Sequence, residues 1–267
     1  MSLKIAINGA GGRMGREVIR AAHAMKNITL IGGSVRPGSE SEGEDLGRIG
    51  GLDRLGIATV SDESAFTDAQ AVIDFSAPDA AIKMLGVLPE GCAFITGTTG
   101  YDREQSKTME AAAQDRAIVA AGNFSLGVNL LTALAETAAK ALGEDWDIEI
   151  SETHHRRKAD APSGTALMLG RAAARGRNAS LDALAEYARY GQTGPRKEGK
   201  IGFQVSRAGG IVGEHEITFT SETERVLLGH TALDRSIFAE GALKAALWAA
   251  GQKPGLYDMQ DVLGLKQ

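Results

Sequence analysis

Near its start the chain reads Ile5-Ala6-Ile7-Asn8-Gly9-Ala10-Gly11-Gly12-Arg13-Met14-Gly15-Arg16. A short apolar run, typical of a strand, leads at once into glycines, and the residues after the glycines have helical spacing. A glycine motif in this setting, between a strand and a helix, predicts a dinucleotide-binding site. The glycines follow the pattern Gly9-x-x-Gly12-x-x-Gly15, since the commoner G-x-G-x-x-G spacing would place Met14 at its third glycine.

Each glycine of this motif has a physical role. Gly9 permits a tight turn, Gly12 lets the backbone approach a pyrophosphate, and Gly15 lets the helix pack closely on the strand. The N–H groups and the positive end of the helix then face the phosphates, with Arg13 beside them. The alternative is an ordinary glycine-rich turn, which the order of the following elements disfavours.

Up to Ala120, short apolar runs alternate with helical runs. These are Leu3–Ile7, Arg13–His23, Ile28–Ile31, Ala71–Phe75, Pro78–Leu88, Ala93–Thr96, Arg103–Ala113 and Ala117–Ala120. Such alternation predicts parallel strands joined by helices, hence an α/β fold with a Rossmann-like, doubly wound parallel sheet. The acidic, glycine-bearing segment Pro37–Asp45 has no apolar period and predicts a mobile surface loop.

The alternation of strands and helices ends after Asn123, where a second, α+β domain is expected to begin. A helix near Leu126–Leu142 precedes a half-exposed strand at Trp146–Ile150, and another helix is expected near Thr165–Ala174. Three alternating runs predict antiparallel strands of one sheet: Ile201–Val205, Glu216–Phe219 and Val226–Gly229. We expect one domain over residues 1–125, a second over 126–235, and a last segment, 236–267, whose helix at Ile237–Ala250 packs back on the first.

Composition excludes several classes of protein. The 267 residues are 43% hydrophobic and 24% charged with 34 glycines, which is typical of a globular α/β protein. A net charge of -5 gives no general attraction to nucleic acid or to an anionic membrane, so an anionic ligand needs a local cluster of cations. The one cysteine, Cys92, lies in an apolar run and is expected to be a buried strand thiol.

The sequence also predicts where the protein resides. Met1 leads directly into the first strand without a signal h-region, and no stretch approaches the ~20 apolar residues of a membrane span. A single cysteine allows no disulfide within the chain. We therefore expect a protein of the reducing cytoplasm.

The end of the second strand bears on the choice of cofactor. An NAD site usually carries an acid about 20 residues after the glycines, where it accepts from the ribose hydroxyl. Here Gly32–Arg36 contains no acid, and the first one is Glu40. Arg36 offers a cation where a 2′-phosphate would lie, although a solvated loop arginine is nearly as good an interpretation.

Two further tetrapeptides follow predicted parallel strands: Gly97-Thr98-Thr99-Gly100 and Gly122-Asn123-Phe124-Ser125. The carboxyl ends of parallel strands are where open α/β sheets bind ligands. Small hydroxyl residues and glycine there suit close contact with a nicotinamide ribose or its amide. Helix caps and turns explain each tetrapeptide equally well when it is taken alone.

The segment from Glu152 to Thr165 has the highest density of residues that could bind or react with a substrate. His154-His155-Arg156-Arg157-Lys158 packs two histidines, two arginines and a lysine into five residues of an otherwise acidic chain. Pro162-Ser163-Gly164-Thr165 then begins an apolar helix whose first N–H groups form an anion site. The cations of this segment and the N–H groups of the helix together predict a site that binds two carboxylates. The alternative is that the basic segment is a solvated surface, as such runs usually are. A zinc site lacks further ligands at sensible spacing, so no metal is expected.

Together with Gly213-Glu214-His215, these segments closely resemble the dihydrodipicolinate (4-hydroxy-tetrahydrodipicolinate) reductase family over nearly the whole chain. The resemblance implies that NADH or NADPH reduces a cyclic dicarboxylate, with loss of water, to tetrahydrodipicolinate in the diaminopimelate branch of lysine biosynthesis. It also implies a homotetramer assembled through the sheet of the second domain.

The resemblance assigns roles to matching residues. His154 is implied as proton donor and Lys158 as the catalytic, substrate-orienting cation. The implied substrate contacts are His155, Ser163, Gly164 and Thr165. The implied cofactor contacts are Gly9, Ala10, Gly11, Gly12, Arg13, Met14, Gly97, Thr98, Thr99, Ala121, Gly122, Asn123 and Phe124, to which the position after the second strand adds Arg36. Many members carry an acid followed by arginine after the second strand, whereas Val35-Arg36 stands here, which puts a preference for NADH in doubt.

Two other functions remain open at this point. A dehydrogenase of another small acid, of the aspartate or homoserine type, would share the plan but has no special need for His154 and His155 beside Lys158. A regulator that senses the NAD(P)H ratio would keep the glycines but has no need of Lys158. An imidazole that gives a proton near neutral pH and an ammonium that neutralises a carboxylate favour the reductase.

Overall fold

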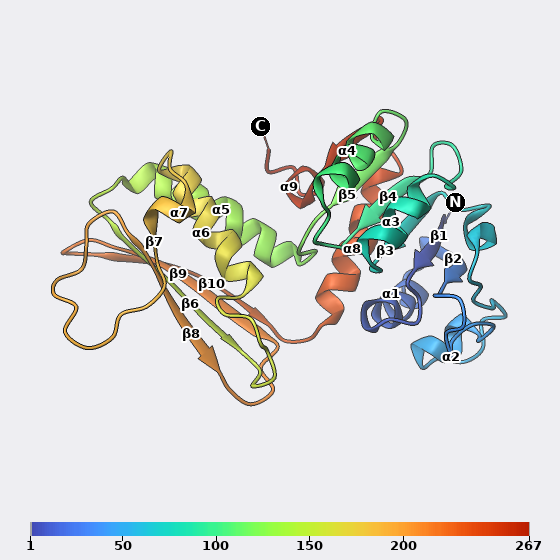
Figure 1. The fold of residues 1–267 in the computed structure, drawn as a ribbon, viewed down its shortest axis with the longest axis horizontal. Coiled ribbons are helices and arrows are strands. Elements are labelled where there is room, and N and C mark those ends of the chain that lie inside the picture. The colour runs from blue at the N-terminus through green and yellow to red at the C-terminus, as the bar shows by residue number, and fades with distance from the viewer. Residues whose placement is uncertain (1, 267) are drawn as a thin grey trace. The chain divides into compact units, whose positions relative to one another are not determined.

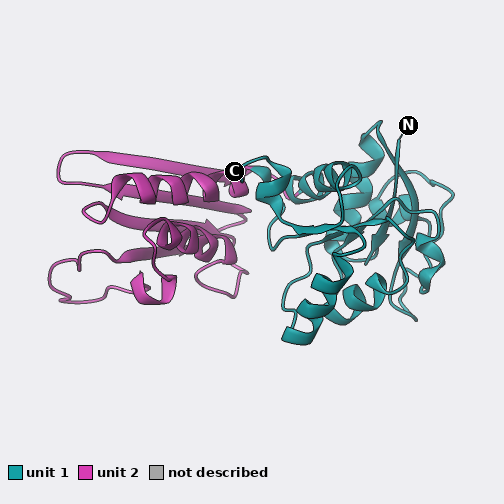
Figure 2. Cartoon of the chain, turned by 90° about the horizontal axis from the view of Figure 1, so that it is seen from above, with its two compact units in different colours: residues 1–126, 236–267 teal, residues 127–235 magenta. Residues whose placement is uncertain are grey.

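The computed structural model describes residues 2–266 and divides into two units (Figures 1 and 2). Unit 1 takes residues from both ends of the chain, up to Leu126 and from Ser236 onward. Unit 2 is the continuous segment Gly127–Arg235. No helix among residues 2–266 is long and apolar enough to cross a membrane.

Unit 1 is built on six strands whose pairings are all parallel. In spatial order they are β11 (Gly255–Tyr257), β5 (Ala117–Ala120), β4 (Ala93–Thr96), β3 (Ala71–Asp74), β1 (Leu3–Asn8) and β2 (Ile28–Ser34). Its helices are α1 (Arg13–Ala24), α2 (Leu46–Gly50), α3 (Pro78–Leu85), α4 (Arg103–Ala112), α8 (Ser236–Ala249) and α9 (Met259–Val262), with a 3₁₀ turn η1 (Glu63–Phe66). The predicted doubly wound α/β class is confirmed.

Alternation along the strands gives this sheet two buried faces. Ile5 and Ile7 point to the side that carries α1 and α8, whereas Ala6 points to the side that carries α3 and α4. Because both faces are covered, the strands are apolar throughout rather than alternating. The helix α8 packs on α1 and on β3, β4 and β5, so the C-terminal segment belongs to the core of unit 1.

One local prediction in unit 1 is corrected. The second strand runs on to Ser34, beyond Ile31, because Gly32 and Gly33 pair with β1. A Cβ on either glycine would lie too close to neighbouring atoms. The segment Pro37–Asp45 is a largely exposed loop, but its last residue is tied into the fold. Asp45 is buried, caps α2 and accepts from the N–H groups of Leu55 and Gly56.

Unit 2 has a five-stranded sheet in the order β10 (Arg225–Ala232), β9 (Gly213–Thr220), β6 (Asp147–His154), β8 (Ile201–Arg207), β7 (Ala185–Glu186). Its helices are α5 (Leu126–Leu142), α6 (Gly164–Gly176) and α7 (Leu181–Leu184). The prediction of antiparallel strands is wrong for β8, which runs parallel to its neighbours β6 and β7. Only β9 pairs antiparallel, with β6 and β10. The apolar face of this sheet packs against α5, α6 and α7.

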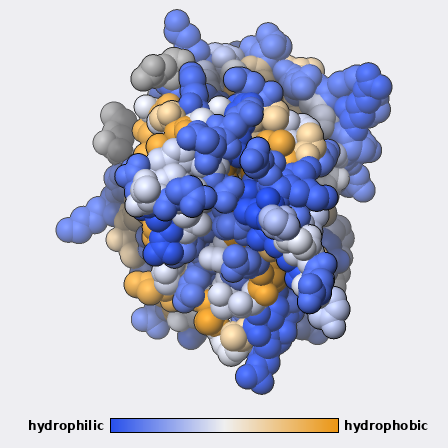
Figure 3. Space-filling view, turned by 90° about the vertical axis from the view of Figure 1, so that its left-hand side faces the viewer, coloured by the Kyte–Doolittle hydropathy of each residue, from blue (hydrophilic) through white to orange (hydrophobic). Residues whose placement is uncertain are grey.

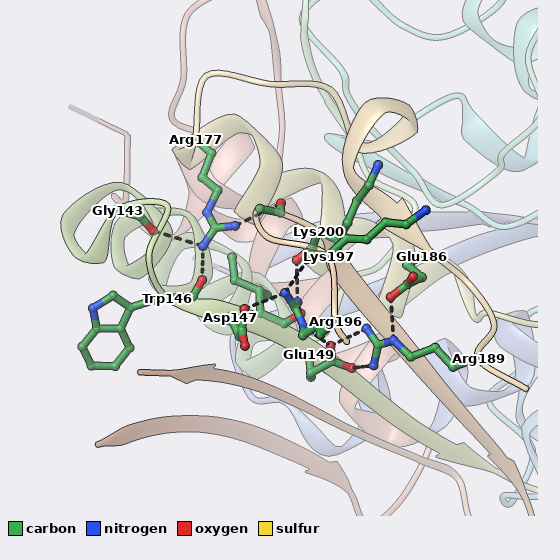
Figure 4. A network of polar contacts seen from close by, with 12 residues as sticks. Gly143, Trp146, Asp147, Glu149, Arg177, Glu186, Arg189, Arg196, Lys197 and Lys200 are labelled. Atoms are coloured by element: carbon green, nitrogen blue, oxygen red, sulfur yellow. Dashed lines mark hydrogen bonds and ion pairs between the residues drawn. The ribbon is translucent and has the colours of Figure 1, made fainter. Parts of the chain in front are cut away.

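Arginines attach the long connection between β7 and β8 to the start of β6 (Figure 4). Arg196 binds the carboxylates of Asp147 and Glu149, and Arg189 makes two bonds, of 3.0 and 2.7 Å, to Glu149. Burial acts to raise the pKa of Glu149, but hydrogen bonds from Arg189 and Arg196 outweigh it and lower that pKa. The connection is thereby held in one place although it carries little regular structure.

The surface is mainly hydrophilic on the face drawn in Figure 3, with small hydrophobic patches between charged side chains. Cys92, expected to be a buried strand thiol, is buried just before β4, and burial raises its pKa to about 11. This thiol therefore stays protonated and has little nucleophilic character near neutral pH.

Candidate active site

The glycine turn after β1 has the geometry that the sequence motif predicts. Gly9 adopts φ +86°, a left-handed conformation that favours glycine, and a Cβ there would lie 3.0 Å from the Phe75 carbonyl oxygen. A Cβ on Gly15 would lie 2.4 Å from the Gly9 oxygen. Gly9 thus makes the turn and Gly15 lets α1 pack closely on it.

The N-terminus of α1 lacks a cap from its own side chains. Gly12 is the N-cap residue, in extended backbone, and offers no side-chain acceptor to the first N–H groups of the helix. Helix N-terminal N–H groups without such a partner favour an anion. This cradle fits the pyrophosphate of a dinucleotide. Ala10 has no exposed surface and Met14 packs on the core, so both would act through their backbone.

A cavity beside the turn brings the glycine motif and the end of β2 together. It is lined by Gly9, Ser34 and Arg36 among others, so Arg36 and the glycine turn face the same cavity. Asp62, Glu63 and Lys83 line the same cavity. These three charged residues carry no motif and lie far from Gly9 in the sequence, so sequence reasoning missed them.

The two tetrapeptides follow β4 and β5, as expected from their positions in the sequence. The side chain of Asn123 accepts from the Ser125 N–H, at 2.8 Å, and so forms a turn. Phe124 is buried in the core with its ring edge-to-face on Phe75, 5.7 Å away. Any contact of Phe124 with a cofactor would therefore use its backbone. The Thr98 hydroxyl is bound within the protein, to Asp74.

In unit 2, the alternation of β6 continues past the predicted end of the strand. Ile148 and Ile150 are buried on the helix-covered face, and the same period of two puts Glu152 and His154 on that face next. Glu152 and His154 are only 3% and 8% exposed. A carboxylate and an imidazole are thus built into the end of an apolar layer, beside the N-terminus of α6.

Glu152 is the centre of this cluster. Its carboxylate accepts two bonds from Arg207, at 2.8 and 2.9 Å, one from the Ser163 N–H at 3.0 Å, and lies 2.5 Å from His154 Nδ1. Burial acts to raise the pKa of Glu152, but the bonds from Arg207, His154 and Ser163 outweigh it and lower that pKa. Glu152 therefore stays ionised and fixes the imidazole of His154.

The contact with Glu152 decides which nitrogen of His154 is available. Because Nδ1 faces the carboxylate, Nε2 is the ring nitrogen that this contact leaves available. A Cβ on Gly213 would lie 3.0 Å from this Nε2, so glycine at that position leaves space in front of it. His215 packs edge-on against His154, 5.0 Å away, and burial lowers the pKa of His215 to about 4. His215 is therefore neutral near pH 7.

The other predicted substrate residues also belong to unit 2. Lys158 is bound to Asp160 at 2.9 Å, a bond that lowers the pKa of Asp160. His155 has its pKa lowered by burial and by the charge of Arg157. Gly164, the first residue of α6, is exposed, and a Cβ on it would meet no atom within 4 Å.

Ser163, implied above as a substrate contact, lies at the start of α6. It is 1% exposed, and its hydroxyl oxygen accepts from the Ala166 N–H and lies 3.0 Å from His215 Nε2. Its side chain is thus engaged in capping α6, next to Thr165 in the first turn. The sequence interpretation missed Glu152, Arg207 and His215 as partners of the site. Glu152 continues the buried alternation of β6 and His215 lies in a segment that carries the family resemblance, whereas Arg207 carried no signal.

Comparison with known proteins follows this division of the chain. Residues 3–124 match the family model described as dihydrodipicolinate reductase, N-terminus, and residues 127–263 match the model of its C-terminus. The chain belongs to the dihydrodipicolinate reductase family. The N-terminal domain of this family implies the use of a nicotinamide dinucleotide.

Relatives share the whole length of the chain. A 4-hydroxy-tetrahydrodipicolinate reductase of Ruegeria pomeroyi is 51% identical over 263 residues, covering 98% of both chains. One of Parvibaculum lavamentivorans is 49% identical over 267 residues, with 99% of this chain and 98% of the relative covered. The chain is accordingly an oxidoreductase of this family.

Solved structures show the same fold. A dipicolinate-bound dihydrodipicolinate reductase from Paenisporosarcina sp. TG-14 has a TM-score of 0.78 at 21% identity, with 98% of this chain and 99% of that chain covered. A myo-inositol dehydrogenase from Corynebacterium glutamicum has a TM-score of 0.60 at 14% identity, with 99% and 94% covered. The two-unit architecture therefore occurs in reductases and dehydrogenases that differ widely in sequence.

Proposed function

We propose that the chain reduces 4-hydroxy-tetrahydrodipicolinate to tetrahydrodipicolinate, with loss of water, at the expense of NADH or NADPH. This reaction belongs to the diaminopimelate route to lysine. The observation that supports it most directly is the match to both halves of the reductase family, with about half of all residues identical to curated reductases. The buried Glu152–His154 pair beside the exposed start of α6 provides chemistry suited to this reaction.

The residues of unit 2 divide the work of binding and proton transfer. His154 Nε2 gives a proton to the substrate, while Glu152 holds the ring and stabilises its cationic form. The Lys158 ammonium leaves Asp160 to neutralise a substrate carboxylate, and the first N–H groups of α6 receive the other. When bound, the dinucleotide supplies the hydride. The protein thus contributes orientation and charge neutralisation.

The direct test is oxidation of NADPH and NADH by the purified chain with enzymatically generated substrate, followed by absorbance. The proposed reaction is supported if the chain oxidises the reduced cofactor when this substrate is present. It should not do so with aspartate semialdehyde or another small acid in its place. Equal or faster turnover of another small acid would instead favour the dehydrogenase alternative.

Lys158→Ala is expected to raise KM and lower kcat together. One substrate carboxylate would then be left without a cationic partner, which costs both binding and transition-state stabilisation. Steady-state kinetics and titration with pyridine-2,6-dicarboxylate measure the two effects. Lys140→Ala, at an exposed position of α5, is the matched control. Wild-type kinetics for Lys158→Ala would contradict this role and would indicate that the basic segment is only a solvated surface.

Arg36→Ala tests the choice of cofactor. With Val35 in place of an acid and Arg36 in the cavity beside Gly9, we expect the wild type to use NADPH at least as well as NADH. The variant should lose kcat/KM for NADPH selectively, because its cavity keeps Asp62 and Glu63 but lacks one cation. Arg54→Ala, which is exposed, serves as control. A strong wild-type preference for NADH that the substitution leaves unaltered would contradict this assignment.

We also propose that the chain forms a homotetramer through the sheet of unit 2, as its family resemblance implies. The strands β8 and β10 expose Val205, Val226 and Leu227, with 40%, 37% and 48% of their surface accessible. Apolar area of this kind is more stable when a second subunit covers it.

A further inference from the structure

One buried carboxylate in unit 1 has no role in the proposed chemistry. Asp74, the last residue of β3, has no exposed surface and accepts four side-chain hydrogen bonds. Oδ1 accepts from Asn8 Nδ2 at 2.8 Å and from the Ser76 hydroxyl at 2.5 Å. Oδ2 accepts from the hydroxyls of Thr96 and Thr98, both at 2.7 Å. Both carboxylate oxygens are thus fully used.

The direction of these bonds requires a pure acceptor at position 74. Asn8 Oδ1 already accepts from the Ser34 hydroxyl, so its amide nitrogen is the group that faces Asp74. The Thr98 oxygen accepts from the Ser76 N–H, and the Thr96 oxygen accepts from the Thr98 N–H. Each of the two threonine hydroxyls therefore accepts from a backbone N–H while it donates to Asp74, and the Thr96 oxygen also lies 2.8 Å from the Tyr101 hydroxyl. An amide at position 74 would place a donor opposite a donor.

The bonds join the carboxyl ends of four neighbouring strands. Asn8 ends β1 immediately before Gly9, and Ser34 ends β2. Ser76 follows β3, while Thr98 follows β4. Asn8, Ser34 and Ser76 line the cavity that also contains Gly9 and Arg36. The carboxylate itself is covered, so it reaches the cavity only through its partners.

We propose that Asp74 is a positioning residue for the dinucleotide, fixing the turns after β1, β3 and β4 without touching the cofactor. The proposal rests on the proposed function only in taking the ligand to be a nicotinamide dinucleotide. A charged carboxylate at the centre resists rearrangement, because every donor around it would lose a charge-assisted bond. Burial raises the pKa of Asp74, which shows how little solvent helps to stabilise this charge.

The test is the affinity of Asp74→Asn for NADPH and for NADH, measured by titration of the intact chain. We expect both dissociation constants to rise at least about tenfold, equivalent to about 1.4 kcal/mol. Affinity for pyridine-2,6-dicarboxylate, measured without cofactor, should stay at the wild-type value because its partners lie in unit 2. Asp115→Asn, an exposed carboxylate of unit 1, should bind both dinucleotides as the wild type does.

A second pair of variants covers the case in which Asp74→Asn fails to fold. Thr96→Val keeps the shape of a fully buried side chain and removes one donor to Asp74, whereas Thr96→Ser retains it. Weaker dinucleotide binding in the valine variant that the serine variant restores supports the proposal.

Two results would overturn it. One is unchanged dinucleotide affinity in Asp74→Asn or in Thr96→Val. The other is an equal loss of dinucleotide and dicarboxylate affinity, which would mark Asp74 as a general stability residue. Because binding is measured directly, a wild-type chain that binds dinucleotides but fails to reduce the substrate would refute the proposed function and leave this inference standing.

Discussion

His154→Gln is expected to lower kcat by about 10²–10⁴-fold, the range for loss of a positioned proton donor. Glutamine occupies similar space and retains a hydrogen-bonding amide, but it has no proton to give near neutral pH. The affinity for NADPH should change little, since the glycine turn and the Asp74 network lie in unit 1. Steady-state kinetics together with NADPH titration measure both quantities.

The neighbouring histidine provides the control for this result. His215 packs against His154 but is neutral, so His215→Gln tests ring packing without removing the donor. Its kcat should fall much less than that of His154→Gln. Near wild-type turnover in His154→Gln would remove the catalytic assignment, and an equal loss in both variants would reduce His154 to a packing role.

Gly12→Val is expected to abolish dinucleotide binding while unfolding stays cooperative. A Cβ on Gly12 would meet only the Gly9 oxygen, at 3.2 Å, so the fold accommodates it with a small shift. The branched side chain would nevertheless stand over the N–H groups of α1, where the pyrophosphate is expected. Cofactor titration and thermal unfolding followed by circular dichroism measure the two effects.

Substitutions at two other glycines serve as controls for Gly12→Val. Gly251→Val, where the nearest atom to an added Cβ is 3.8 Å away, should bind the cofactor normally. Gly15→Val should lower the melting temperature, because its Cβ would overlap the backbone at 2.4 Å. If Gly12→Val bound NADPH with unchanged affinity, the phosphate site would have to lie elsewhere.

The sequence predicted β1 to β5 of unit 1 well because each is a short apolar run next to a helix, but it missed the short edge strand β11. It failed where pairing, rather than local pattern, decides the structure. Gly32 and Gly33 have poor strand propensity, yet they extend β2 because β1 pairs with them. The parallel direction of β8 likewise depends on its neighbours β6 and β7, which no local period encodes.

The candidate site was predicted less completely than the fold. His154 and Lys158 lie in a dense basic segment that attracts notice in the sequence. Arg207 and His215 come from other strands and meet Glu152 and Ser163 only through the register of the sheet. Asp74 was passed over because one acid at the end of an apolar strand has no distinctive pattern.

The two-segment construction of unit 1 has a consequence for biosynthesis. The helix α8 contributes Ala242, Leu243 and Ala246 to the core around β1, yet it emerges from the ribosome after all of unit 2. Domains generally fold as units during synthesis, in order from the N-terminus. Here that order is inverted: the contiguous unit 2 has its whole core available first, while the part of the unit 1 sheet that α8 covers stays exposed until α8 has been synthesised.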